Sequence, residues 1–143
     1  MVYNSFDIAN KILQKGAQSD GGELISNLKL QKLLYYMQGF HLAVFDTPLF
    51  DDDIFAWQYG PVLPEVYYRY KANGNKGIEP VGEVIVLEEK EEKLFDEVFS
   101  VYGEFSAIGL MNLTHEEDPW KNTPIGEKIL KDKMTEFFKT RIV

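Results

Sequence analysis

The chain has 143 residues, of which 45% are hydrophobic and 14% aromatic, enough apolar material to build the core of one compact domain. It contains no cysteine, which excludes disulfides, thiolate nucleophiles and metal sites built from cysteine ligands. Acidic residues outnumber basic ones by 23 to 15, and the resulting net charge of −8 repels nucleic-acid phosphates and anionic lipids. We therefore expect no nucleic acid and no membrane among its partners.

The sequence carries no sign of export or membrane insertion. Residues 1–7 lack both the basic and the apolar segment of a signal peptide, and no apolar run approaches the roughly 20 residues that cross a bilayer. No internal repeat, low-complexity stretch or linker divides the chain. We expect a soluble cytoplasmic protein whose residues 1–143 form a single domain.

The first half of the chain is dominated by one long helical pattern. A short helix is predicted over residues 7–15, and a longer one over residues 26–45, where Ser26 can cap the first turn and Pro48 prevents continuation. Apolar residues recur in this longer helix at the spacing of a single buried stripe. The predicted core positions on that stripe are Leu30, Leu33, Leu34, Met37 and Val44. The helix is nearly apolar all round, so we expect it to form the axis of the domain.

We expect the polar residues on this central helix to have structural roles. Lys29 and Lys32 near its start are expected to lie in water. His41 falls on the buried stripe, where a histidine is more often a core residue with its hydrogen bonds satisfied than a metal ligand.

The middle of the chain predicts two short strands and a short helix. Residues 54–59 are rich in β-favouring aromatic residues and end at Gly60 and Pro61, and residues 83–87 form a second strand candidate that can pair with them. Pro64 suits the first position of a helix that continues to about residue 71.

The last third of the chain returns to helical spacing. Helices are predicted over residues 88–102, 107–113 and 126–140, the second of them capped by Ser106. The glutamates and lysines of residues 88–93 are interpreted as a solvated face. The expected fold is therefore mainly α, with about six helices around a central buried helix and one small two-stranded β-hairpin, in a compact single domain.

A polar turn at residues 115–118 holds the densest cluster of ionisable groups, which raises the question of catalysis. A metal or acid/base site built on His115, Glu116 and Asp118 is one hypothesis, but the chain has only two histidines and no H-E-x-x-H spacing. No G-x-S-x-G turn and no glycine-rich phosphate loop is present. We expect no enzyme, no cofactor and no catalytic or metal site, and interpret the turn as a solvated helix cap or a contact surface.

Residues 57–64 form a different kind of segment, because two aromatic residues, a Gly-Pro corner and two further apolar residues stand in eight positions. Tyr67 and Tyr68 follow on the short helix. Rigid aromatic side chains dominate binding hot spots, since they bury a large area at little entropic cost. The alternative is that these rings seal the hairpin against the central helix, and the sequence leaves both open.

Three blocks of sequence carry a resemblance to a known family. LKLQKLLYYMQGFHLAVF at residues 28–45, FAWQYGPVLPEVYYRY at residues 55–70 and LTHEEDPW at residues 113–120 resemble, in this order and spacing, the Panacea domain of the SocA-like antitoxin family, also called phage-associated GepA-like proteins. The resemblance implies a mainly helical, non-enzymatic domain that neutralises the toxin of a two-gene pair by direct protein contact.

The resemblance also supplies candidate residues and partners. The matching positions are Lys29, Gln31, Lys32, Tyr35, Trp57, Tyr59, Gly60, Pro61, Val62, Pro64, His115, Pro119 and Trp120. The candidate partner-binding residues are Trp57, Tyr59, Gly60, Pro61, Val62, Pro64, Tyr67, Tyr68, His115 and Trp120. The expected partner is a cognate toxin encoded by an adjacent gene. The alternative is a prophage-associated adaptor that binds a host or phage protein, and the oligomeric state stays open.

Overall fold

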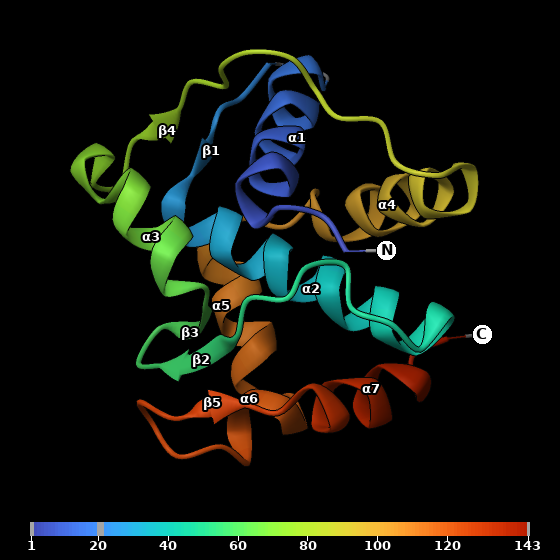
Figure 1. The fold of residues 1–143 in the computed structure, drawn as a ribbon. Coiled ribbons are helices and arrows are strands. Elements are labelled where there is room, and N and C mark those ends of the chain that lie inside the picture. Colours follow the sequence, from blue (N-terminus) through green and yellow to red (C-terminus); the bar gives the residue numbers. More distant parts are fainter. Residues whose placement is uncertain (1, 20–21, 143) are drawn as a thin grey trace.

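The computed structural model describes residues 2–19 and 22–142, and within these ranges the chain forms seven α-helices and five short strands (Figure 1). The helices are α1 (Ser5–Gln18), α2 (Asn27–Phe45), α3 (Pro64–Tyr70), α4 (Glu89–Tyr102), α5 (Ala107–His115), α6 (Asp118–Lys121) and α7 (Lys131–Lys139), and a 3-10 turn, η1, spans Lys71–Asn73. The strands are β1 (Ile25–Ser26), β2 (Ile54–Trp57), β3 (Gly60–Val62), β4 (Gly77–Ile78) and β5 (Lys128–Ile129). The predicted mainly α fold is confirmed. No helix within the described ranges is both long and apolar enough to cross a membrane.

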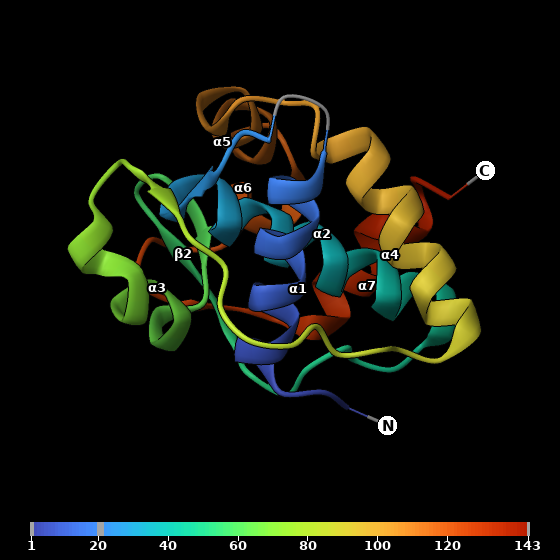
Figure 2. The same ribbon diagram turned by 90° about the horizontal axis from the view of Figure 1, so that it is seen from above.

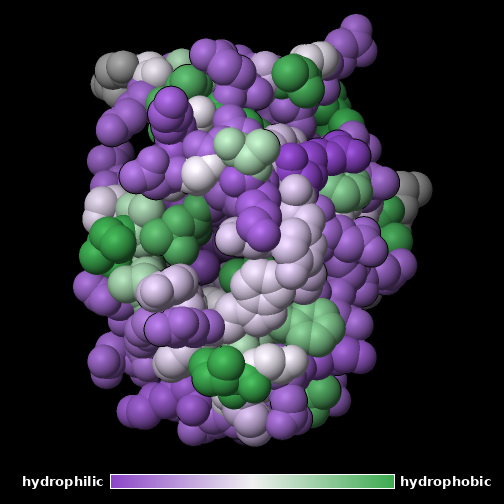
Figure 3. Space-filling model, turned by 90° about the vertical axis from the view of Figure 1, so that its left-hand side faces the viewer, coloured by the Kyte–Doolittle hydropathy of each residue, from purple (hydrophilic) through white to green (hydrophobic). Residues whose placement is uncertain are grey.

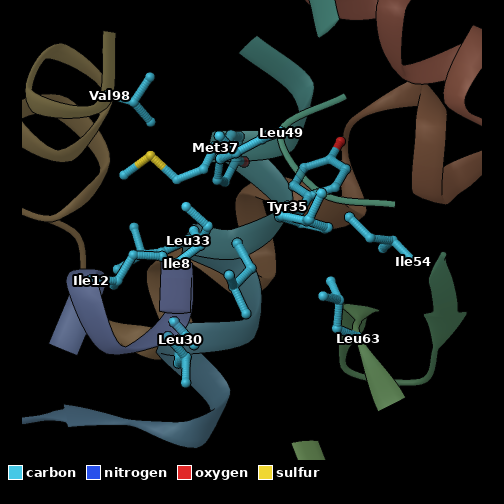
Figure 4. Packing of buried hydrophobic residues seen from close by; sticks show 14 of the residues in the cluster. Ile8, Ile12, Leu30, Leu33, Tyr35, Met37, Leu49, Ile54, Leu63 and Val98 are labelled. Carbon is cyan, nitrogen blue, oxygen red and sulfur yellow. The ribbon is translucent and has the colours of Figure 1, made fainter. Parts of the chain in front are cut away.

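Helix α2 is the axis of the domain. Helices α1, α4, α5 and α7 all pack against it, as the two perpendicular views show (Figures 1 and 2). Figure 4 shows Leu33 and Met37 of α2 directed toward Ile12 of α1 and Val98 of α4. The predicted positions Leu30, Leu33, Leu34 and Met37 are all buried.

The prediction for Val44 is wrong, because its side chain is 43% exposed. Val44 lies on the same stripe as the buried leucines, but it belongs to the last turn of α2. No residue from 44 to 48 is buried, so this end of the helix extends beyond the elements that cover the rest of the stripe.

Both ends of α2 lie where predicted, but the left-handed Asp46 ends the helix two residues before Pro48, which was predicted to stop it. The Ser26 hydroxyl accepts a hydrogen bond from the Lys29 amide at 3.3 Å, and Asp46 ends the helix in a left-handed conformation. Near the middle of the helix, a Cβ added to Gly39 would clash with the Phe138 ring of α7. Glycine at this position therefore allows α7 to pack closely against the axis.

The strands pair differently from the prediction. Strand β2 forms an antiparallel hairpin with β3 and pairs with β5 along its other edge, while β1 pairs with β4. Residues 83–87 are not a strand, because both edges of β2 are already occupied. They run extended past α1, where Lys11 Nζ donates to the Ile85 carbonyl at 2.9 Å. The last helix begins at Lys131 and not at 126, because residues 128–129 pair with β2.

His41 links α2 to α4, and its predicted role as a satisfied core histidine is confirmed. Its Nδ1 lies 2.6 Å from the Thr47 carbonyl oxygen and its Nε2 lies 2.6 Å from a Glu91 carboxylate oxygen. Tyr3 donates to the other Glu91 oxygen at 2.6 Å. The interpretation of residues 88–93 as fully solvated is therefore wrong at Glu91, which is buried by its contact with α2.

Candidate partner-binding pocket

Buried amides on the first turns of α2 fix the segment that follows the hairpin. Gln31 accepts a hydrogen bond from the Leu63 amide at 2.9 Å and donates to the Asn27 side chain at 3.0 Å. Asn27 in turn donates to the Tyr67 carbonyl at 3.0 Å. These three bonds hold the start of α3, and with it the aromatic residues of this region, in one position relative to the axis.

Lys32 is the largest departure from the sequence-based expectation, because its side chain is 0% exposed. Its Nζ donates to the Pro61 carbonyl at 3.1 Å. Gly60 adopts a φ of 109°, and a Cβ added there would stand 2.6 Å from Lys32 Cε. Burial alone lowers the pKa of Lys32 from 10.5 to about 7. The Gly-Pro corner thus closes over a lysine stem that the helical pattern had placed in water.

A second buried ionisable group comes from the turn before α6. The Glu117 carboxylate accepts hydrogen bonds at 3.0 Å from the hydroxyls of Tyr35 and Tyr36, both on α2. Burial raises the pKa of Glu117 to about 7, and these two hydrogen bonds oppose that shift. The interpretation of this turn as solvated is therefore wrong at Glu117, which joins the turn to the axis.

The two regions proposed from sequence as contact surfaces are neighbours in space. Trp120 Nε1 donates to the Trp57 carbonyl at 2.8 Å, and the His115 ring stacks on the Trp120 ring with centroids 4.1 Å apart. His115 Nε2 is buried and has no hydrogen-bond partner among the described residues. Trp57 also meets the rings of Tyr67 and Tyr68 edge-on, at centroid distances of 5.2 and 6.0 Å.

A pocket of about 660 Å³ opens between the hairpin, α2, α3 and α5, and we call it the aromatic pocket. Four of the candidate residues line it, namely Trp57, Tyr59, Val62 and Tyr67. Figure 3 looks onto the side where α3 and the hairpin lie, and pale and green side chains gather near the middle of this face.

The remaining candidates hold the surroundings of the aromatic pocket. Gly60 and Pro61 are buried at the corner above Lys32, and Pro64 opens α3. Tyr68 is exposed on α3, next to Tyr67. His115 and Trp120 are partly buried beside the hairpin.

Besides Leu28 of α2, sequence reasoning missed three apolar residues of the pocket wall. Ile108 and Met111 come from α5, and Ile125 comes from the loop before β5. Ile108 is 56% exposed and Ile125 is 61% exposed, although both are large and apolar. An isoleucine on a short helix, such as Ile108 on α5, gives little indication of a binding site in the sequence. The fold brings Ile108 close to the hairpin.

The side chains around the aromatic pocket are mostly apolar and aromatic. In residues 2–19 and 22–142, no three histidine or acidic side chains are grouped so that they could hold a metal ion. The aromatic pocket instead combines rigid rings with exposed aliphatic side chains, an arrangement typical of protein contact surfaces.

Comparisons with known proteins identify the family of the chain. The family model described as "Antitoxin SocA-like, Panacea domain" matches residues 30–121. Antitoxin SocA of Caulobacter vibrioides (strain NA1000 / CB15N) is 46% identical over 71 residues, which make up 50% of this chain and 37% of that protein. The aligned region thus spans little more than a third of that relative's length. No solved structure matches the chain. Because the family model covers more than half of the sequence, the chain belongs to the SocA-like antitoxin family and carries its Panacea domain.

Proposed function

We propose that this protein is an antitoxin that neutralises one cognate toxin by direct contact through the aromatic pocket. The observation that carries the proposal is the pocket itself, whose wall includes the exposed apolar residues Tyr59, Ile108 and Ile125. Apolar side chains that remain exposed around one concavity favour burial by another protein. Membership of an antitoxin family makes a toxin the expected partner.

The rigidity of the pocket supports tight binding. The hydrogen bonds of Gln31 and Asn27 hold α3, and the bond from Trp120 to Trp57 holds the hairpin. A surface that is already ordered before contact loses less conformational entropy on binding, so more of the interaction energy appears as affinity.

The expected mechanism is stoichiometric. The antitoxin covers a functional surface of the toxin or traps an inactive shape of it, with no turnover and no cofactor. The net charge of −8 would favour encounter with a basic toxin, because complementary charge mainly increases the association rate.

Co-expression with the neighbouring open reading frame tests the proposal. The neighbour should arrest growth alone and should be tolerated beside the wild-type chain. The double variant Ile108→Asp/Ile125→Asp should lose this protection, since it places two charges on the apolar wall. The matched control Val81→Asp/Val86→Asp changes two exposed valines of the extended segment before α4 and should protect fully.

Two results would contradict the antitoxin role. One is a neighbouring gene that is harmless alone, and the other is a neighbour that stays lethal beside the wild-type chain. If affinity capture instead recovers a stable partner from an unlinked gene, the same pocket serves an adaptor, which is the alternative function.

A further inference from the structure

We propose that the aromatic pocket recognises an aspartate or glutamate side chain, carried on an apolar segment of the protein partner, which pairs with Lys32 at the pocket floor. This inference deepens the proposed function, because the partner it describes is the toxin. It assigns an acidic character to the one toxin side chain that enters the pocket, on a toxin whose overall charge is expected to be basic, and it gives Lys32 a role in recognition.

The charge of the pocket wall differs from that of the whole chain. The protein carries 23 acidic and 15 basic residues, yet the described residues that line the aromatic pocket include Lys32 and Lys71 and no aspartate or glutamate. An overall acidic protein therefore presents one concavity whose formal charge is positive. Charge complementarity selects an acidic group as its occupant.

Lys32 has unused hydrogen-bonding capacity. An ammonium group has three donors, and the hydrogen bond that the structure gives Nζ within the described ranges goes to the Pro61 carbonyl. No carboxylate of the described residues forms a salt bridge with Lys32, in contrast to Lys11, whose Nζ lies 2.6 Å from Glu92. The buried cation is thus left without a counter-ion inside the folded chain.

An unneutralised buried cation is costly for the fold. A charge taken out of water is stable only when it is paired and hydrogen-bonded, and burial lowers the pKa of Lys32 to about 7. Departures of this kind from the rules of stable packing are concentrated at functional sites. A carboxylate supplied by a partner would remove the penalty at the moment of binding.

The hairpin turn lies between Lys32 and solvent. Gln58 and Tyr59 are both exposed and both line the aromatic pocket. They are the two residues before Gly60, which contacts the Lys32 stem. The Lys32 side chain is 0% exposed, so a partner side chain reaches its ammonium group only when this turn moves aside. The surrounding wall of aromatic and aliphatic side chains excludes water and strengthens the ion pair.

A display library of random 12-residue peptides, selected on the intact chain, tests the inference without knowledge of the toxin. Recovered peptides should place an aspartate or glutamate among aromatic and branched apolar residues. They are then synthesised with acetylated N-termini and amidated C-termini, so that the side chain is the source of any carboxylate contact.

The affinities of these peptides give the decisive numbers. Changing the peptide acid to its amide should weaken binding at least about 30-fold, because removing one partner of a buried charge pair costs about 2 kcal/mol or more. Lys32→Met should weaken binding to the same degree. The matched control Lys29→Met makes the same change one turn earlier on α2, outside the pocket, and should alter affinity less than about twofold. A thermal melt of Lys32→Met at or above that of the wild type excludes unfolding as the cause.

Three outcomes would overturn the inference. They are selected peptides that lack an acidic residue, acidic peptides that bind Lys32→Met as well as wild type, and peptides whose binding needs a free C-terminal carboxylate.

Growth assays separate this inference from the proposed function. If Lys32→Met protects fully against the neighbouring gene product, the role of Lys32 is contradicted and the antitoxin role stays intact. If the neighbouring gene product is lethal beside the wild-type chain, the antitoxin role is contradicted and the peptide result stays intact.

Discussion

Replacing Lys32 with methionine should stabilise the protein at neutral and acidic pH. Folding lowers the pKa of Lys32 from 10.5 to about 7. Since one pH unit is worth about 1.4 kcal/mol, holding the protonated lysine in the folded chain costs on the order of 5 kcal/mol below pH 7. Methionine has a similar volume and no charge, so the variant avoids this cost. It also loses the hydrogen bond to the Pro61 carbonyl, and leaving that carbonyl unpaired costs about 1–3 kcal/mol. The net gain in the free energy of unfolding should be about 2–4 kcal/mol at pH 6.

The pH dependence of this gain is the sharper test. A depressed pKa means that Lys32 contributes full stability only above its unfolded value of 10.5, and that this stability is lost as pH falls toward about 7. The advantage of Lys32→Met should therefore be largest below pH 7 and should shrink by about 3 kcal/mol at pH 9.

Urea unfolding curves at pH 6, 7, 8 and 9, followed by tryptophan fluorescence, measure the difference directly. Lys76→Met, which removes an exposed lysine, serves as the control and should change the free energy of unfolding by less than about 0.5 kcal/mol at every pH. A Lys32→Met variant that is less stable than wild type at pH 6, or whose gain does not vary with pH, would refute the reasoning.

Three further predictions follow from the buried contacts. Glu117→Gln should remove a pH-dependent loss of stability. A raised pKa means that the contribution of Glu117 to stability is fully present below pH 4.5 and that about 3 kcal/mol is lost as pH rises through about 7. Urea curves at pH 5 and 8 should therefore show the stability of the wild type, relative to that of Glu117→Gln, falling by about 2–3 kcal/mol. Gly60→Ala should lower the free energy of unfolding by about 1–3 kcal/mol, because Gly60 has a φ of 109° and the new methyl group would clash with Lys32. An unchanged midpoint of the urea titration would contradict this. Gly39→Ala should shift the thermal midpoint down by several degrees through its clash with Phe138, and in a Phe138→Ala background the same change should have little effect.

Local sequence signals predicted most of the helices. Ser26 and Ser106 cap α2 and α5, and Pro64 opens α3, because caps and proline act on the residues beside them and need no information from elsewhere in the chain. The strand pairings were harder to predict from the sequence. The extended character of residues 83–87 was visible, but β5 takes the edge of β2, and such a choice depends on segments about 75 residues apart.

The burial of three ionisable side chains was the feature that the sequence predicted least well. Lys32, Glu91 and Glu117 were each predicted to lie in water, and each is buried by an element distant in the sequence: the Gly-Pro corner covers Lys32, and α2 covers the two glutamates. Helical periodicity assigns a residue to a face, but it does not tell which faces other elements cover. The aromatic residues of the hairpin could be named from sequence, whereas Ile108 and Ile125 could not, because α5 and the loop before β5 reach the aromatic pocket only through the fold.

The pairing of β2 on both sides has a consequence for how any partner can be recognised. With β3 along one edge and β5 along the other, β2 has no free row of amides and carbonyls that an incoming strand could extend. The outer strands of this small sheet, three and two residues long, are too short to template a stable added strand. A partner bound at the proposed site would therefore be distinguished by the shape and polarity of individual side chains, and we expect one or two substitutions around the aromatic pocket to change which partner fits.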